Sequence, residues 1–335
     1  MIKKHQNIIF LFMIVAFAAN RIYAKTLTRE IDLSGIWLFE IGDDLNYAKP
    51  AYDDSKWSKV YVPSPWENEG FPGYDGYGWY RIKVIIPKHL ENKLLYLKLG
   101  QIDDVDRTYI NGNLLGGFGD FPPHYQTAYD KNRLYEIPAG FLNYGKSNVI
   151  TVRVYDYHHR GGIVYGDIGL YSQDDVLNLL VDLSGLWKFN TGNNEDWASP
   201  DFDDSGWRRI GVPSHWEQQG FPHYDGYAWY RKSFRIKKDK DRKLILVIGK
   251  IDDVDQVFIN GISIGSTGEF PYGQDNFYSR FNRKRAYFIP PYLLNENKIN
   301  TIAVKVYDHG EHGGIYSGHI GIVTRKEYLN YQQKE

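Results

Sequence analysis

The sequence contains no cysteine. That absence excludes a disulfide framework, a thiol nucleophile, a thiolate metal site and a cysteine carrying a lipid anchor. The chain must therefore be stabilised by its hydrophobic cores. Domains of about 150 residues bury enough surface on folding to do this without a covalent link.

An excess of one charge is also missing. The 40 basic and 41 acidic residues give a formal net charge of -1, and the two signs are mixed along the chain. Proteins that bind nucleic acid usually carry a basic patch or stripe. We therefore expect no nucleic-acid partner.

Long apolar runs are scarce. The clearest one extends from Ile8 to Ala19 and follows Lys3 and Lys4, with Ala24 shortly after it. This order is typical of a secretory signal peptide, and the run is short for a membrane span. We expect a signal peptide at residues 1–24, a secreted or periplasmic mature protein and no stable membrane span; an N-terminal anchor is the alternative.

The chain carries an internal repeat with a period of about 150 residues. Three motifs of the first copy are Asp53-Asp54-Ser55, Val62-Pro63-Ser64 and Trp79-Tyr80-Arg81, and they return as Asp203-Asp204-Ser205, Val212-Pro213-Ser214 and Trp229-Tyr230-Arg231. A repeat of this length matches one ordinary domain rather than a solenoid unit. We predict two homologous domains, at residues 27–172 and 177–324, followed by a loosely ordered polar tail at 325–335.

Strand signals dominate both copies, as short apolar or alternating segments separated by Gly, Pro, Asn and Asp. In the first copy we expect strands at Gly35–Ile41, Lys59–Val62, Trp79–Ile86, Lys93–Leu99, Asp106–Ile110, Leu114–Gly116, Leu134–Ile137, Val149–Tyr155 and Ile168–Tyr171. The pairs Asn111-Gly112 and Asn260-Gly261 favour tight hairpin turns. The pattern predicts an all-β fold of two tandem antiparallel jelly-roll β-sandwich domains.

Each copy contains the same series of short motifs: Leu-Ser-Gly-x-Trp, Asp-Asp-Ser-x-Trp, Val-Pro-Ser-x-Trp-Glu, Trp-Tyr-Arg and a strand ending in Asn-Gly. This series resembles the sugar-binding-like (galactose-binding-like) jelly-roll domain of family 2 glycoside hydrolases such as β-galactosidases and β-glucuronidases. The Ile-Asp-Asp-Val-Asp block is also similar to a module in sialate O-acetylesterase-like proteins. In those enzymes another domain carries the catalytic residues, so the resemblance implies a fold and a sugar context rather than an activity.

Two aspartate blocks are candidates for chemistry: Asp103, Asp104 and Asp106, and Asp252, Asp253 and Asp255. Alternation along a strand sends Asp104 and Asp106 to one face and Asp103 to the other, so the three do not automatically converge. Ion pairing with Arg81 and Arg231, contact with a ligand or a structural Ca²⁺, and acid–base work on a glycoside all stay open. We expect no other cofactor, and the sequence assigns no catalytic residue and no metal-ligand set.

Aromatic residues make up 16% of the chain, and Tyr and Trp suit both sandwich cores and sugar ligands. Several of them lie in loops rich in Gly and Pro, and loops on a rigid sandwich often carry function. The candidate ligand-binding residues are Trp66, Tyr74, Asp75, Tyr77, Asp104 and Phe121 in the first copy and Trp216, Tyr224, Asp225, Tyr227, Asp253 and Phe270 in the second. Packing of these loops against the sheets is the alternative explanation.

Three functions fit these features. The first, which we favour, is a secreted non-catalytic carbohydrate-binding protein that acts beside polysaccharide-degrading enzymes. The second is a glycan-active hydrolase related to family 2 glycoside hydrolases, and the third is an accessory subunit that docks on a larger glycosidase. The expected partners are accordingly a glycan or polysaccharide and, in the third case, a glycosidase.

Overall fold

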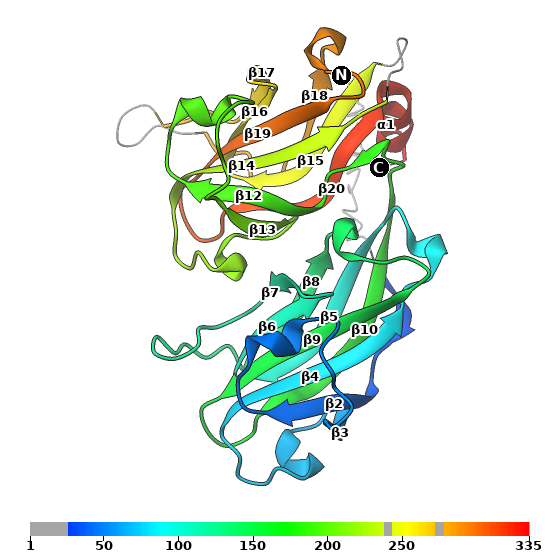
Figure 1. The fold of residues 1–335 in the computed structure, drawn as a ribbon, viewed down its shortest axis with the longest axis vertical. Helices are drawn as coiled ribbons and strands as arrows, with labels where there is room; N and C mark the ends of the chain where they lie inside the picture. Colours follow the sequence, from blue (N-terminus) through cyan, green and yellow to red (C-terminus); the bar gives the residue numbers. More distant parts are fainter. Residues whose placement is uncertain (1–25, 238–242, 272–277, 335) are drawn as a thin grey trace, which may run out of the picture.

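The computed structural model describes residues 26–237, 243–271 and 278–334, so the predicted signal peptide lies outside the described residues. Each copy folds as a sandwich of one four-stranded and one six-stranded sheet, and every strand pair is antiparallel. The two sandwiches follow one another along the long axis of the molecule (Figure 1). The predicted all-β architecture of two tandem antiparallel β-sandwiches is confirmed.

The first sandwich contains strands β1 to β10. Their bounds are β1 Leu27–Asp32, β2 Gly35–Ile41, β3 Ser58–Val62, β4 Gly76–Ile85, β5 Lys93–Asp103, β6 Val105–Ile110, β7 Asn113–Gly116, β8 Asn132–Ile137, β9 Ser147–Asp156 and β10 Gly162–Val176. The four-stranded sheet has the order β1-β10-β5-β8, and the six-stranded sheet has the order β3-β2-β4-β9-β6-β7.

The second sandwich repeats this topology strand for strand. Its strands are β11 Val181–Asp182, β12 Gly185–Thr191, β13 Arg208–Val212, β14 Gly226–Arg235, β15 Leu244–Asp252, β16 Val254–Ile259, β17 Ile262–Thr267, β18 Lys284–Ile289, β19 Ile299–Asp308 and β20 Gly314–Thr324. The sheets have the orders β11-β20-β15-β18 and β13-β12-β14-β19-β16-β17. The internal repeat of the sequence is therefore a repeat of the whole topology.

The tight turn predicted at Asn111-Gly112 is present. Asn111 and Gly112 have φ angles of 50° and 79° between β6 and β7, which is the left-handed conformation that a tight hairpin needs. The edge strand β1 was missed, because its sequence Leu-Thr-Arg-Glu-Ile-Asp is mostly polar. β10 also runs longer than predicted in both directions, from Gly162 to Val176.

The C-terminal segment differs from the prediction of a loosely ordered tail. Arg325–Gln332 forms the helix α1. The Thr324 side chain caps it by accepting a hydrogen bond from the Glu327 amide at 3.1 Å. Tyr331 is buried in a cluster that includes Leu177 from the connection between the sandwiches. The buried Tyr331 ring and the Thr324 cap thus order this segment, although its polar composition predicts a loose tail.

Hydrogen bonds connect the two sandwiches directly. The Glu136 carboxylate on β8 accepts bonds from the Gly318 amide and the Ser317 hydroxyl on β20, both at 2.8 Å. Burial raises the pKa of Glu136, and these bonds oppose the rise. Gln219 adds a second link, from its amide nitrogen to the Leu115 carbonyl at 2.9 Å.

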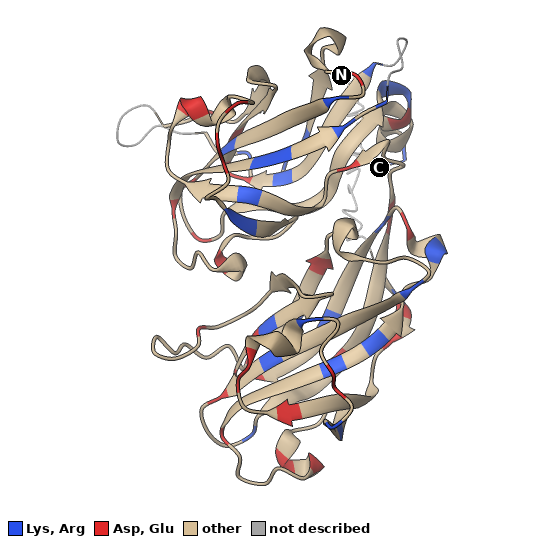
Figure 2. Ribbon diagram, in the orientation of Figure 1, with Lys and Arg blue, Asp and Glu red and all other residues tan. Residues whose placement is uncertain are grey.

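Charge is distributed rather than concentrated. Figure 2 shows basic and acidic residues on strands and loops of both sandwiches. Within the described ranges, no helix is long and apolar enough to cross a membrane.

We predict that Glu136→Ala weakens the coupling between the sandwiches. The partly buried Gly318 amide loses its acceptor, and a fully buried donor left unpaired costs about 1–3 kcal/mol, which is the upper limit here. Calorimetry should show a lower unfolding temperature or a separation into two transitions. Glu91→Ala, which removes an exposed carboxylate, is the control and should leave the profile unchanged. A Glu136→Ala profile identical to that of the parent protein would contradict the prediction.

Candidate functional site

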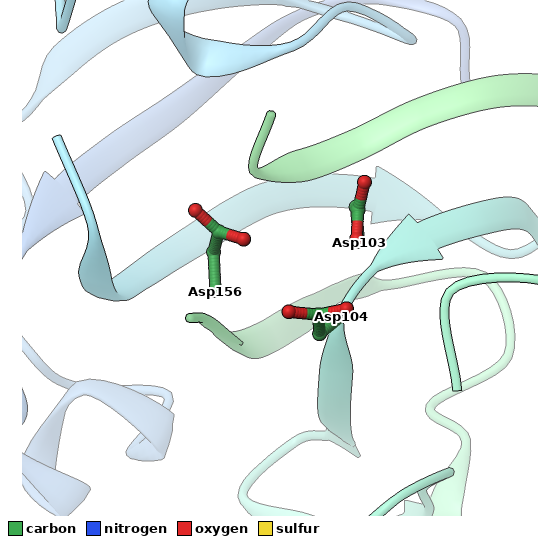
Figure 3. A group of neighbouring side chains, drawn as sticks. All are labelled: Asp103, Asp104 and Asp156. Carbon is green, nitrogen blue, oxygen red and sulfur yellow. The ribbon is translucent and has the colours of Figure 1, made fainter. Parts of the chain in front are cut away.

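Three aspartates gather at one end of the first sandwich. Asp103 is the last residue of β5, Asp104 follows it before β6, and Asp156 is the last residue of β9. One carboxylate oxygen of each lies within 4.8 Å of those of the other two, and Figure 3 shows the three side chains around one shared space. The second sandwich repeats the group with Asp252, Asp253 and Asp308. We call each group the aspartate triad.

The expectation that Asp103 and Asp104 point apart is wrong. Side chains alternate strictly only within one strand. Asp103 ends β5 of the four-stranded sheet, and the next strand, β6, belongs to the six-stranded sheet, so the chain changes sheets at Asp104. Alternation therefore does not extend across this junction.

Asp104 is held by hydrogen bonds. Thr127 Oγ1 donates to Oδ1 at 2.5 Å, and the Tyr157 amide donates to Oδ2 at 3.1 Å. Burial disfavours the ionised form, but the hydrogen bonds prevail and lower the pKa of Asp104. Asp104 is therefore the triad member most readily kept as a carboxylate. In the second copy, Asp253 has equivalent partners in the Ser279 hydroxyl and the His309 amide.

Asp156 is the unusual member of the triad. Its side chain is fully buried, yet neither carboxylate oxygen has a hydrogen-bond partner among the described residues. Burial, with repulsion from Asp104 and Asp103, raises the pKa of Asp156 to about 7. Buried polar groups are normally paired, so two unpaired oxygens on one buried side chain need an explanation.

The second triad has the same property. Asp308 is fully buried, and neither of its carboxylate oxygens has a hydrogen-bond partner within the described part of the chain. Burial and repulsion from Asp252 raise the pKa of Asp308 to about 8. The Gly310 amide is close enough to oppose this rise, although it forms no hydrogen bond of acceptable geometry with either oxygen. Burial also raises the pKa of Asp103 and that of Asp252 to about 7, with Asp104 and Asp253 respectively adding to the rise.

A buried arginine supports the triad from inside the sandwich. Arg133 on β8 donates from Nε to Asp106 at 2.9 Å, and both side chains are completely inaccessible to solvent. The other Asp106 oxygen accepts a bond from the Tyr135 hydroxyl at 2.6 Å. Arg133 also donates to the backbone carbonyls of Asp104 at 2.8 Å and Ala128 at 2.6 Å. Its charge is thus paired with Asp106, and its remaining donors position the chain around Asp104.

The interpretation that the aspartate blocks pair with Arg81 and Arg231 is wrong. Arg81 pairs with Asp54 at 3.1 Å, and Arg231 pairs with Asp204 at 2.8 Å. In the aspartate block of the second copy, Asp255 pairs with Arg285 at 2.7 Å. Arg81 and Arg231 thus hold the Asp-Asp-Ser turns on the outer side of the six-stranded sheets. The partners of the aspartate blocks are arginines that occur about 30 residues later in the sequence.

Trp66 and Trp216 were predicted as surface residues of ligand-binding loops, and this placement is wrong. Both are fully buried, and each indole Nε1 donates at 3.0 Å to a loop carbonyl, that of Tyr74 for Trp66. Gly161 lies against the Trp66 ring so closely that a Cβ would come within 2.2 Å of it. The tryptophan therefore fixes one loop against the next and requires glycine at its contact point.

The remaining aromatic candidates are partly used in internal packing. Tyr77 and Phe121 stack with ring centroids 5.7 Å apart, and the Arg153 guanidinium lies 4.1 Å from the Phe121 centroid. The second copy has the same arrangement of Tyr227, Phe270 and Lys305. Tyr74 and Tyr224 are half-buried and donate through their hydroxyls to the Tyr77 and Tyr227 carbonyls, while Asp75 and Asp225 are exposed.

A more accessible aromatic pair lies beside the first triad. Tyr157 is 57% exposed and stacks on the half-buried Tyr125, with centroids 5.3 Å apart and an interplanar angle of 26°. The Tyr157 amide also donates to Asp104 at 3.1 Å. The structure thus joins an exposed aromatic face to the aspartate triad through one residue. In the second copy, His309 occupies the position of Tyr157.

Sequence reasoning missed Asp156 and Asp308. Both copies end a strand in Val-Tyr-Asp and continue to Gly-Gly, so the signal was present. That motif lies about 50 residues from the aspartate block, and strand pairing brings them together. The Asp104 amide donates to the Tyr155 carbonyl at 3.1 Å, which places Asp156 next to the block.

Comparison with known proteins supports the resemblance. Residues 192–312 match the family described as the β-galactosidase second all-β domain. A β-galactosidase of Bacteroides ovatus is 31% identical over 140 residues, which cover 37% of this chain and 15% of that protein. A β-glucuronidase of Formosa agariphila is 29% identical over 158 residues, covering 42% of this chain and 14% of that protein. The matches confirm a likeness to accessory β-sandwich domains of family 2 glycoside hydrolases.

The matching region is a small part of those relatives, since it spans less than a fifth of the length of either. Among solved structures, β-glucuronidase 2 of Bacteroides uniformis is 18% identical with a TM-score of 0.36, over 87% of this chain and 28% of that one. A further β-glucuronidase from glycoside hydrolase family 2 is 13% identical with a TM-score of 0.37, over 88% and 29% of the two chains. Scores this low do not establish an equivalent arrangement of the whole chain.

We predict that Arg133→Met lowers the free energy of unfolding by about 3–5 kcal/mol, because it leaves Asp106 buried without its partner. Urea denaturation measures the effect. Replacing both residues, as Arg133→Met with Asp106→Leu, should recover most of the loss. The control is Lys131→Met, which breaks an exposed pair with Asp130 and should change stability by less than about 0.5 kcal/mol. A loss no larger than that of the control would contradict the role of the ion pair.

The raised pKa values predict a specific pH dependence in the presence of a chelator. A carboxyl whose pKa is raised on folding favours the folded state below its unfolded pKa of about 3.9, and this contribution is lost as pH rises through the folded value. Asn cannot ionise, so the variant Asp156→Asn/Asp308→Asn should gain thermal stability relative to the parent between pH 5 and pH 8. A difference that stays constant over this range would contradict the raised values of about 7 and 8.

Proposed function

We propose that this chain is an exported, non-catalytic module that binds a glycan and serves glycoside hydrolases that degrade it. The binding surface is the end of the first sandwich that carries the aspartate triad. The exposed face of Tyr157 provides a platform for a sugar ring, and the polar groups beside it provide hydrogen bonds to hydroxyls.

The observation that carries this proposal is the connection between the aromatic pair and the triad. Tyr157 stacks on Tyr125, and its amide is bonded to Asp104, so the ring and the carboxylates have a fixed relative position. The exposed Asp75 carboxylate adds a polar group close enough to Asp156 to contribute to its raised pKa. Flat apolar surface next to oriented polar groups is the chemistry that sugar recognition requires.

The comparisons support the sugar context. The relatives are named as a β-galactosidase and a β-glucuronidase, and the matched region is an accessory part of much longer chains. Binding of a glycan by this chain is our extension of that context. The substrates of those enzymes indicate galactose- or glucuronic-acid-containing glycans as the first class to test.

The triad geometry favours binding over hydrolysis. A glycosidase needs two carboxyl groups about 5–5.5 Å or 6.5–9.5 Å apart on either side of the sugar. Here the three aspartates lie around one space with oxygens within 4.8 Å, and Asp104 and Asp156 are buried. This spacing is shorter than either of those separations, and two of the three side chains are inaccessible to a substrate, so the triad is a poor acid–base pair.

A second candidate function is docking on a larger glycosidase. It is supported by the fact that the relatives carry this region inside much longer chains. Co-purification with a glycosidase, together with no retention on any glycan, would favour docking over glycan binding.

We predict that Tyr157→Ala weakens retention on glycan affinity gels about five- to tenfold, the loss expected from one stacking contact of about 1–1.5 kcal/mol. The gels should include galactans and glucuronic-acid-containing polysaccharides. Because Tyr157 is exposed, its loss should leave thermal stability unchanged. The matched control is Tyr292→Ala, which removes a ring that is 84% exposed in a short 3-10 helix of the second copy.

Two results would contradict the proposal. The first is equal retention of the parent protein and Tyr157→Ala on every gel that binds the parent. The second is the absence of binding by the parent protein to every glycan of an array that contains plant, algal and host glycans.

A further inference from the structure

We propose that each sandwich binds one Ca²⁺ ion at its aspartate triad. The ligands are Asp103, Asp104 and Asp156 in the first copy and Asp252, Asp253 and Asp308 in the second. This inference is independent of glycan binding, because it concerns the buried carboxylates and not the aromatic surface.

The first argument is geometric. Ca²⁺ binds oxygen ligands at about 2.3–2.6 Å, so two ligands of one ion lie at most about 5 Å apart. The triad oxygens lie within 4.8 Å of one another, which is compatible with one shared ion. Figure 3 shows that the side chains surround a common space rather than pointing away from it.

The second argument is the unpaired, buried carboxylate. Asp156 has no accessible surface, and within the described residues neither of its oxygens has a hydrogen-bond partner. Hydrogen bonds from Thr127 and from the Tyr157 amide orient Asp104. Asp156 points into the triad and has no such partner among the described residues. A cation supplies the missing partner for both oxygens. Asp308 has the same two properties in a separate domain.

The third argument concerns local charge. Besides the three triad carboxylates, Glu67 brings a fourth to this end of the sandwich, where it accepts a hydrogen bond at 3.2 Å from the amide of Gly161 in the loop that follows Asp156. Arg133 approaches the triad from inside but forms its ion pair with Asp106 at 2.9 Å. The site therefore has an excess of negative charge that a divalent cation can balance.

The donor set selects the metal. The triad offers carboxylate oxygens only, and hard oxygen ligands suit Ca²⁺ and Mg²⁺ rather than Zn²⁺ or Cu²⁺. Mg²⁺ needs a near-ideal octahedron at about 2.0–2.1 Å and keeps several of its waters, whereas Ca²⁺ accepts irregular sites with longer bonds. A largely buried site built from two separate segments, Asp103-Asp104 and Asp156, fits Ca²⁺ better.

The ion would act as a link between sheets. Asp103 belongs to β5 of the four-stranded sheet, and Asp156 belongs to β9 of the six-stranded sheet. A shared ion therefore joins the two layers at the end where the loops emerge. In a chain without disulfides, such a link stabilises each domain by RT ln(1 + c/Kd), where c is the free Ca²⁺ concentration, so its contribution grows with the logarithm of c once c exceeds Kd.

The test uses the full mature chain stripped with a chelator and titrated with CaCl2 by calorimetry. We expect two ions per chain in the parent protein, one in Asp156→Asn, one in Asp308→Asn and none in the double variant. Ca²⁺ at 2 mM should raise the unfolding temperature of the parent by at least about 3 °C and leave the double variant unchanged. Mg²⁺ at the same concentration should give a smaller shift.

Two controls separate this proposal from glycan binding. Asp174→Asn, which changes an exposed aspartate outside the triads, and Tyr157→Ala should both retain two Ca²⁺ ions. The proposal is overturned if the stripped parent protein shows neither binding heat nor a thermal shift with Ca²⁺. It is equally overturned if the folded double variant, checked by circular dichroism, still binds two ions.

Discussion

The structure of each sandwich end depends on one buried ion pair, Arg133 with Asp106 in the first copy and Arg285 with Asp255 in the second. The pair joins the inner surfaces of the two sheets, because β8 lies in the four-stranded sheet and β6 in the six-stranded one. Burying two charges is costly unless every donor and acceptor is matched. Here the arginine also binds the Asp104 carbonyl at 2.8 Å, so matching its donors determines the path of the chain at the candidate site.

This pairing also determines the electrostatics of the site. Because Asp106 takes the arginine charge, the triad of Asp103, Asp104 and Asp156 forms no ion pair with a basic side chain in the described part of the chain, and burial raises the pKa values of Asp103 and Asp156. The two copies share this frame but differ in the loop that follows it, where the second copy has His309 at the position of Tyr157. An interior shared by the two copies, with loops that differ, agrees with the proposal of a cation site in both copies and of a glycan surface in the first.

Much of the fold could be predicted from the sequence, because the evidence for it is local or repeated. The Asn111-Gly112 turn requires positive φ angles, and the alternation of residues such as Gly35–Ile41 indicates a strand directly. The site was less predictable, because it depends on contacts between distant segments. Trp66 occurs in a loop rich in Gly and Pro, which favours a surface position, but in the fold its ring is buried in the core and packs against Gly161. In the sequence Asp156 is only the last residue of a strand; its place beside Asp104 follows from the hydrogen bond between the Asp104 amide and the Tyr155 carbonyl on β9.

The central claim is that the buried carboxylates of the triads are balanced by a divalent cation rather than by protons. A crystal structure of the chain grown at pH 8 with CaCl2, with anomalous data collected at long wavelength, tests it most directly. We predict one anomalous peak in each sandwich, within about 2.3–2.6 Å of oxygens from Asp156 and Asp308 respectively. Triads without a peak, with a short carboxyl–carboxylate hydrogen bond in its place, would contradict the account.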